Sequence, residues 1–85
     1  MTKKLPPIHP GEILREEYML PLALSSNALA RAIGVTAARI NELVRERRGI
    51  SADPALRLAR YFGHDALSWP NLQLRYDIEC AQDAI

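Results

Sequence analysis

Residues 26–45 read SNALARAIGVTAARINELVR, and this stretch decides the fold. Its apolar residues recur at intervals of three and four, which is the spacing of two short amphipathic helices. The face expected to be buried on the first helix comprises Ala28, Leu29, Ala32 and Ile33. Gly34 can take the left-handed conformation that ends a helix, and the hydroxyl of Thr36 can cap a second helix over about residues 37–45. The stretch therefore predicts two helices joined by a turn of three or four residues.

The same stretch has the requirements of a helix-turn-helix. Ala30 is small at the position where the second helix would cross the first. The apolar residues expected to lock this crossing are Ile33, Val35, Ile40 and Leu43. The other side of residues 36–45 would then project outward, and a helix of that size fits the major groove of DNA. A plain pair of packed helices would not need such a polar outer surface, so the surface favours DNA binding.

The predicted DNA contacts fall into two groups. Small or hydrogen-bonding side chains on the outer face of the second helix are expected near base edges: Thr36, Ala37, Ala38, Arg39, Asn41 and Glu42. Side chains of the helix that begins near residue 26, and of the basic loop after residue 44, are expected to hold phosphates: Ser26, Asn27, Arg31, Arg45, Arg47 and Arg48. Ser26 and Asn27 belong to the second group because backbone N–H groups at a helix start bind phosphate.

The charge distribution agrees with a local DNA-binding face. The net charge is only +1, but residues 31–60 hold seven arginines and three acidic side chains. Residues 61–85 hold one arginine and four acidic side chains. A basic centre between acidic flanks indicates one face for a polyanion and another for a different, cationic partner.

Three further helices are expected around this pair. The first begins at Pro10 and ends near Met19 or Leu20, because the residue before Pro21 is biased out of the helical region. Another follows a Ser51 cap and ends at Gly63. Its predicted buried face is Ala55, Leu56, Ala59 and Phe62. The domain predicted from these helices covers residues 9–85, after a flexible arm over residues 1–8.

The last helix has two apolar stripes and two candidate caps. Asp65 or Ser68 could cap it, and Ser68 is favoured. One stripe comprises Trp69, Leu72, Tyr76 and Cys80, and the opposite one comprises Leu74, Ile78, Ala81 and Ile85. A chain of 85 residues has no second core for the second stripe. We therefore expect Leu74, Ile78, Ala81 and Ile85 to form a dimer interface.

Several functional classes are not expected from the sequence. Cys80 is the single cysteine, which excludes an internal disulfide and fits the cytoplasm, and the histidines stand at no metal-ligand spacing. No segment has the length of a membrane span or the pattern of a signal peptide. The serines and histidines have no nucleophile elbow and no glycine-rich phosphate loop, so neither an enzyme nor a cofactor or small-molecule ligand is expected. The alternative to a DNA-binding protein is a module that binds only other proteins. A failure to bind DNA at low salt would favour this alternative.

Several short motifs resemble the HigA antitoxins, in the order in which that family has them. They span nearly the whole chain, from His9 to about Glu79. The matching segments are HPGEIL at 9–14, LA at 29–30, IGV at 33–35, INE at 40–42, RGISAD at 48–53, ALRLA at 55–59, WPNLQ at 69–73 and RYD at 75–77. Two positions depart from the family: Pro70 replaces a helix-compatible residue, and Glu46 lies in a loop that commonly carries glycine.

The resemblance implies an all-α, five-helix fold like that of the lambda repressor, a homodimer, and binding to an operator at the chain's own promoter. It also implies a neighbouring HigB-type toxin, an mRNA-cleaving ribonuclease that the antitoxin neutralises. Either the acidic first helix, with Glu12, Glu16 and Glu17, or the acidic tail could face such a basic toxin. The alternative is a stand-alone XRE-type transcriptional repressor without a toxin.

Overall fold

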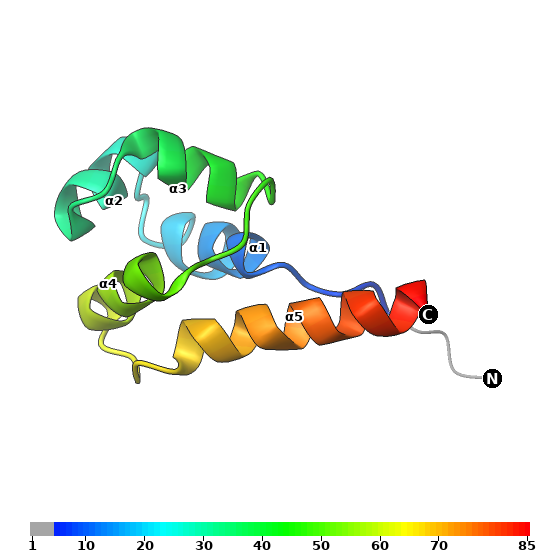
Figure 1. The fold of residues 1–85 in the computed structure, drawn as a ribbon. Coiled ribbons are helices and arrows are strands. Elements are labelled where there is room, and N and C mark those ends of the chain that lie inside the picture. Colours follow the sequence, from blue (N-terminus) through cyan, green and yellow to red (C-terminus); the bar gives the residue numbers. More distant parts are fainter. Residues whose placement is uncertain (1–4) are drawn as a thin grey trace.

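The computed structural model describes residues 5–85, and the regular structure within them is helical (Figure 1). In chain order the elements are α1 (Pro10–Ile13), η1 (Leu14–Met19), α2 (Ser26–Ile33), α3 (Ala37–Val44), α4 (Ala52–Phe62) and α5 (Ser68–Ala84). Because α1 runs into η1 without a break, the predicted all-α fold of five helices is confirmed. Residues 1–4 of the predicted arm lie outside the described residues, and residues 5–8 have no regular secondary structure.

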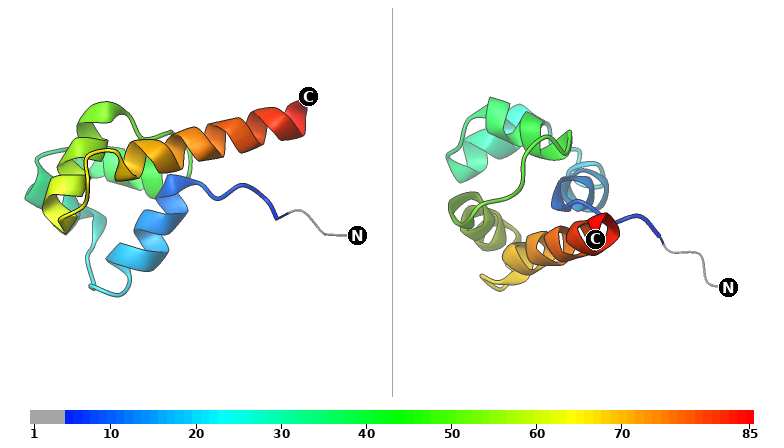
Figure 2. Two further views of the ribbon diagram at one scale, coloured as in Figure 1. Left: turned by 90° about the horizontal axis from the view of Figure 1, so that it is seen from below. Right: turned by 45° about the vertical axis from the view of Figure 1, so that its right-hand side comes forward.

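One apolar core lies between the helices. α3 contacts α1 and α2, while α5 contacts α1 and α4. The buried apolar side chains are Leu14, Met19, Leu29, Ala30, Ile33, Ile40, Leu43, Ile50, Ala55, Leu58, Ala59 and Trp69. Figure 2 shows α5 running along one side and extending at its C-terminal end beyond the other helices. None of the helices in residues 5–85 combines the length and the apolar character that a membrane span needs.

The first helix begins as the sequence predicts and then widens into a π-helix. Nδ1 of His9 accepts the N–H of Gly11 at 2.9 Å, which satisfies a donor left free at the helix start. Pro10 is the first helical residue, where its missing N–H costs nothing. In η1 the hydrogen bonds span five residues, as from the N–H of Leu20 to the carbonyl of Arg15 at 3.0 Å. The predicted end near Met19 is confirmed, but Leu20 before Pro21 keeps right-handed helical angles, and the π-helix was not expected.

The turn between α2 and α3 forms as predicted. Ser25 caps α2, since its hydroxyl oxygen accepts the N–H of Ala28 at 3.0 Å. Gly34 has a φ of 76°, in the left-handed region, and Thr36 caps α3 by accepting the N–H of Arg39 at 3.2 Å.

The buried face of α2 differs from the prediction at two positions. Leu29 and Ile33 are buried, but Ala28 and Ala32 are exposed. The face also includes Ala30, which is 3% exposed against the crossing α3. With about 100° per residue, a face centred between positions 29 and 30 turns positions 28 and 32 toward solvent.

Two details of α4 correct the sequence analysis. Leu56 is 38% exposed, whereas Leu58 is fully buried. Leu58 lies on the same side as Ala55 and Phe62, at intervals of three and four residues, while Leu56 is turned by about 100° from Ala55. Ser51 has the extended backbone of a cap, but its side chain makes no capping hydrogen bond.

The start of α5 is also corrected. Ser68 is the first helical residue, and Leu67 occupies the cap position without a side-chain hydrogen bond. Asp65 stabilises this start instead, because its carboxylate accepts the N–H of Leu67 at 2.9 Å and its carbonyl accepts the Ser68 hydroxyl at 2.7 Å. Pro70 falls in the first helical turn, where its missing N–H is tolerated. Trp69 anchors this end of α5 in the core.

Candidate nucleic-acid interface

The outer face of α3 is presented to solvent as the sequence predicts. Ile40 and Leu43 are 1% and 4% exposed on its inner side, where they pack in the core. The predicted base-contacting residues with exposed side chains are Thr36, Ala38, Arg39, Asn41 and Glu42. Ala37 is half-buried and packs against the core, so it offers the least surface of the six predicted residues. The polar outer face therefore extends from the Thr36 cap along the length of α3.

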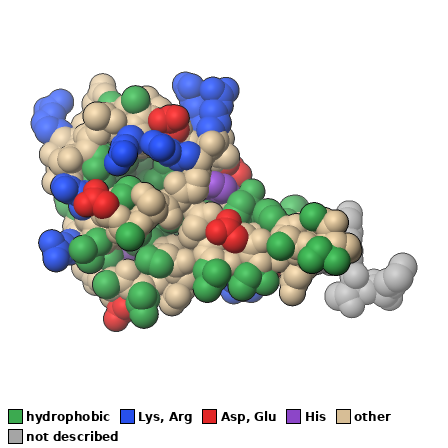
Figure 3. All heavy atoms as spheres, in the orientation of Figure 1, with side chains coloured by type: hydrophobic (Ala, Val, Ile, Leu, Met, Phe, Trp, Pro, Cys, Tyr) green, Lys and Arg blue, Asp and Glu red, His purple; other side chains and the backbone are tan. Residues whose placement is uncertain are grey.

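Five of the six predicted phosphate-binding residues are exposed. Asn27 and Arg31 of α2 are exposed, and Ser26 is half-buried as the first helical residue after the Ser25 cap. Arg45, Arg47 and Arg48 are exposed in the segment between α3 and α4. Figure 3 shows Lys and Arg side chains gathered around the part of the molecule formed by α2 and α3, whereas hydrophobic side chains predominate along α5.

One residue predicted to contact bases forms an ion pair with one predicted to contact phosphate. The guanidinium of Arg48 lies 3.5 Å from the carboxylate of Glu42, and both side chains are about half exposed. A pair in this setting is weak, because water and salt screen it. The pair therefore leaves the Arg48 guanidinium available to another anion at small cost.

The end of α3 is closed by a Schellman motif that sets the path of the basic loop. The N–H of Arg47 donates to the carbonyl of Glu42 at 2.9 Å, and the N–H of Glu46 donates to that of Leu43 at 3.0 Å. Glu46 has a φ of 61°, in the left-handed region that a side chain disfavours. Position 46, where this chain has glutamate in a loop that commonly carries glycine in the family, is thus a position whose backbone conformation favours glycine.

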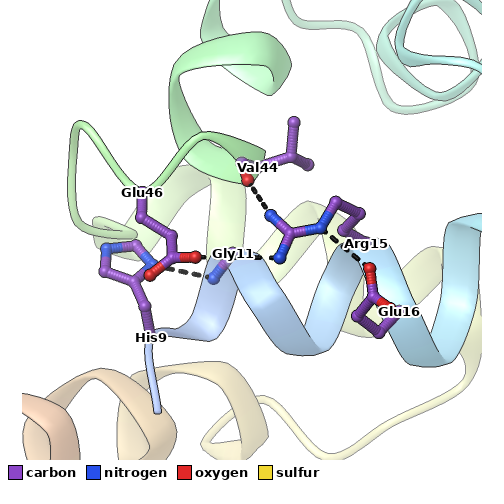
Figure 4. Close-up of polar contacts among 6 residues, drawn as sticks. All are labelled: His9, Gly11, Arg15, Glu16, Val44 and Glu46. Atoms are coloured by element: carbon purple, nitrogen blue, oxygen red, sulfur yellow. Dashed lines mark hydrogen bonds and ion pairs between the residues drawn. The ribbon is translucent and has the colours of Figure 1, made fainter. Parts of the chain in front are cut away.

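Arg15 of η1 binds the C-terminal end of α3, an interaction that the sequence did not predict. Its guanidinium donates to the carbonyl of Val44, lies 3.7 Å from the carboxylate of Glu46 and 2.9 Å from that of Glu16 (Figure 4). A cation at the last carbonyls of a helix stabilises it. The hydrogen bond to Glu16 raises the pKa of Arg15 above its ordinary value.

Gly11 brings α1 close to the end of α3. It is buried, and a Cβ built on it would lie 1.8 Å from the carbonyl oxygen of Leu43. The helix carrying Arg15 can approach α3 only because position 11 has no side chain. Gly11 and Arg15 together fix the orientation of the exposed face of α3 relative to the rest of the domain.

The left-handed position gives a stability prediction. Replacing Glu46 by glycine should yield a protein more stable than replacing it by alanine, by about 1 kcal/mol, since alanine keeps the backbone strain. Both variants lose the ion pair with Arg15, so that loss cancels in the comparison. Thermal unfolding measures the difference, expected as a Tm shift of roughly 4 to 8 °C. Equal melting temperatures would show that the strained backbone costs nothing.

The part of the chain that the structure describes holds no group of three or more His, Cys, Asp or Glu side chains placed to bind a metal ion. His9 instead caps α1, and His64 lies 3.2 Å from the hydroxyl of Tyr18.

The chain is similar to known proteins over nearly its whole length. The family described as Helix-turn-helix matches residues 14–65. Virulence-associated protein I of Dichelobacter nodosus is 62% identical over 79 residues, which are 93% of this chain and 73% of that protein. The solved structure of Pseudomonas aeruginosa antitoxin HigA with the higBA promoter is 54% identical, with a TM-score of 0.88 over 92% of this chain and 85% of that chain.

A second solved structure, of an addiction module antidote protein of a HigA family from Coxiella burnetii, is 42% identical. It has a TM-score of 0.89 and covers 94% of this chain and 87% of that chain. The matched regions include α2, α3 and the helices on either side of them. The sequence identities of 42% to 62% are higher than proteins that share only a fold would have. The chain therefore belongs to the helix-turn-helix family of DNA-binding proteins, among the HigA-type antitoxins.

Proposed function

We propose that this chain is the antitoxin of a HigBA-type module, which represses its own operon and neutralises an mRNA-cleaving toxin. The observation that carries the proposal is the exposed polar face of α3, which exposed arginines precede and follow in the sequence. The similarity to an antitoxin solved with its promoter supports the same use of that face.

In this proposal α3 lies in the major groove and reads few base edges. Arg39 is suited to the two acceptors of guanine, and Asn41 to the acceptor and donor of adenine. Ala38 is small enough to approach a thymine methyl group. Asn27, Arg31, Arg45, Arg47 and Arg48 then contact phosphates, which fixes the orientation of α3 without reading sequence.

We propose that two copies bind together through α5. Leu74, Ile78 and Ile85 are 57%, 48% and 104% exposed, and Ala81 between them is also exposed. Such a stripe on a helix that extends beyond the other helices is suited to a second copy of the same helix. A dimer with two α3 helices fits the paired half-sites that operators of this class of motif present.

The partner to be neutralised is a basic ribonuclease, for which the acidic side chains of the first helix and of the tail remain the two candidate surfaces. In the first helix Glu16 is already paired with Arg15 at 2.9 Å. A neighbouring reading frame for a small basic ribonuclease would separate an antitoxin from a stand-alone repressor.

Substitution of Arg39 and Arg47 tests the proposed roles of the two groups. Arg39→Ala should weaken binding to the operator by about 1 to 3 kcal/mol and reduce the preference over random DNA, because a base contact is lost. Arg47→Ala should weaken binding to both duplexes alike and lower the slope of log affinity against log salt by about one, because a phosphate contact is lost.

Fluorescence anisotropy titrations with both duplexes at several salt concentrations measure these effects. The two variants control each other, since each removes one exposed arginine and the same formal charge. Equal losses on operator and random DNA for Arg39→Ala would contradict its assignment to a base edge.

A further inference from the structure

The loop that carries Arg47 and Arg48 is held at one end by α3 and at the other by α5. The Schellman bonds fix its start at the end of α3. Its other end is held by a side chain from a distant part of the sequence, because the N–H of Ile50 donates to Oε1 of Gln73 at 2.7 Å. Ile50 also anchors this end of the loop, since its side chain is 7% exposed and lies in the core.

The amide of Gln73 is itself fixed in one orientation. Its Nε2 donates to a carboxylate oxygen of Asp77 at 2.9 Å, one turn further along α5. A carboxylate only accepts and a backbone N–H only donates, so both bonds form only when the amide oxygen points to Ile50. Asp77 therefore aims the acceptor of Gln73 at the loop.

Because Gly49 has no side chain, the Gln73 amide can pack closely against the backbone of the loop. A Cβ on Gly49 would come within 3.1 Å of three atoms of the Gln73 amide, closer than ordinary packing allows. The two residues also line a polar cleft between the loop and α5, together with Arg47, Arg48 and Asp77.

We infer that Gln73 is a positioning residue that holds the phosphate-binding loop from α5. The inference rests on the proposed phosphate contacts of Arg47 and Arg48. In the absence of this acceptor the partly buried N–H of Ile50 has no partner, and the backbone between Glu46 and Ile50 gains freedom that DNA binding must remove. Gln73 thus acts on DNA affinity without touching DNA, and it links α5, the proposed dimer helix, to the DNA face.

The test compares Gln73→Met with the exchanged pair Gln73→Glu plus Asp77→Asn. Methionine keeps the length of the side chain but offers the Ile50 N–H only a weak thioether acceptor in place of the amide oxygen. The exchanged pair keeps the net charge and both hydrogen bonds, since a carboxylate at 73 can accept from Ile50 and from the new amide at 77. Arg47→Ala serves as the reference for a lost phosphate contact.

Gln73→Met should bind the upstream promoter duplex and a scrambled duplex about tenfold more weakly, with a lower salt slope and an unchanged preference between them. Exchange of the Ile50 amide hydrogen, followed by NMR, should be faster in this variant. The exchanged pair should restore both affinity and slow exchange. Should Gln73→Met lose overall stability, Gly49→Ala displaces the same amide from the loop side, and it should weaken binding and speed Ile50 exchange in the same direction.

The outcomes separate this inference from the proposed function. If Arg47→Ala weakens binding while Gln73→Met and Gly49→Ala keep wild-type affinity and Ile50 exchange, the loop does not depend on Gln73 and the inference is wrong. If Arg47→Ala changes binding to neither duplex, the phosphate contact itself is wrong. An exchanged pair as weak as Gln73→Met would also contradict the inference, because it keeps the hydrogen bonds.

Discussion

Gly11→Ala is expected to lower the free energy of unfolding by about 3 kcal/mol and to abolish most DNA binding. The added Cβ would lie 1.8 Å from the carbonyl oxygen and 2.8 Å from the carbonyl carbon of Leu43, and backbone atoms cannot rotate away as a side chain can. The substitution by itself favours helix by about 1 kcal/mol, so the clash must exceed that gain. The movement falls on α3, which is why DNA affinity should fall together with stability.

Gly63→Ala is the matched control for this variant. A Cβ on Gly63 would meet no atom within 4 Å, but its φ of 74° is strained for alanine. It should cost about 1 to 2 kcal/mol and leave the affinity of the folded protein for DNA unchanged. Urea unfolding and DNA titration of both variants provide the comparison. Equal stability of the two would show that α1 does not approach α3 as closely as Gly11 indicates.

Ile78→Glu is expected to convert the proposed dimer to a monomer and to lower operator affinity by about 10²- to 10⁴-fold. Ile78 is in the middle of the exposed stripe of α5, where a carboxylate would be buried without a partner in the proposed interface. A monomer binds one half-site and loses the advantage of the second contact, which gives the stated range. Sedimentation velocity measures the first effect and anisotropy the second.

Leu20→Glu controls for the added negative charge. Leu20 is 65% exposed, and it lies after η1 rather than on α5, so this variant should remain a dimer and lose little affinity. If Ile78→Glu sediments as the same species as the wild-type chain, the interface lies elsewhere on the molecule.

The features that could be predicted from the sequence depend on interactions between near neighbours. Thr36 caps α3 three residues ahead, and Gly34 turns the chain by its own backbone conformation. The exposed face of α3 followed from the periodicity of its apolar residues. Such local rules are sufficient for the start of α1, the end of α2 and the start of α3.

The features that were missed depend on tertiary contacts or on small differences in helical phase. Arg15 reaches the end of α3 across 29 positions of sequence, and Gln73 reaches Ile50 across 23, so periodicity gives no sign of either. Leu56 and Leu58 are both leucines on one helix, and only their angle to the core separates them. At α5 the carboxylate of Asp65 acts before the helix while Leu67 takes the cap position, an arrangement that residue preferences did not favour.

The most direct test is the affinity of the full chain for the duplex upstream of its own gene, measured against a scrambled duplex of equal length and composition. Anisotropy titrations at several salt concentrations should give binding to the upstream duplex at least about 10³-fold tighter, with a preference that persists as salt weakens both complexes. Equal affinity for the two duplexes at every salt concentration would contradict operator recognition by α3, and with it the autorepressor.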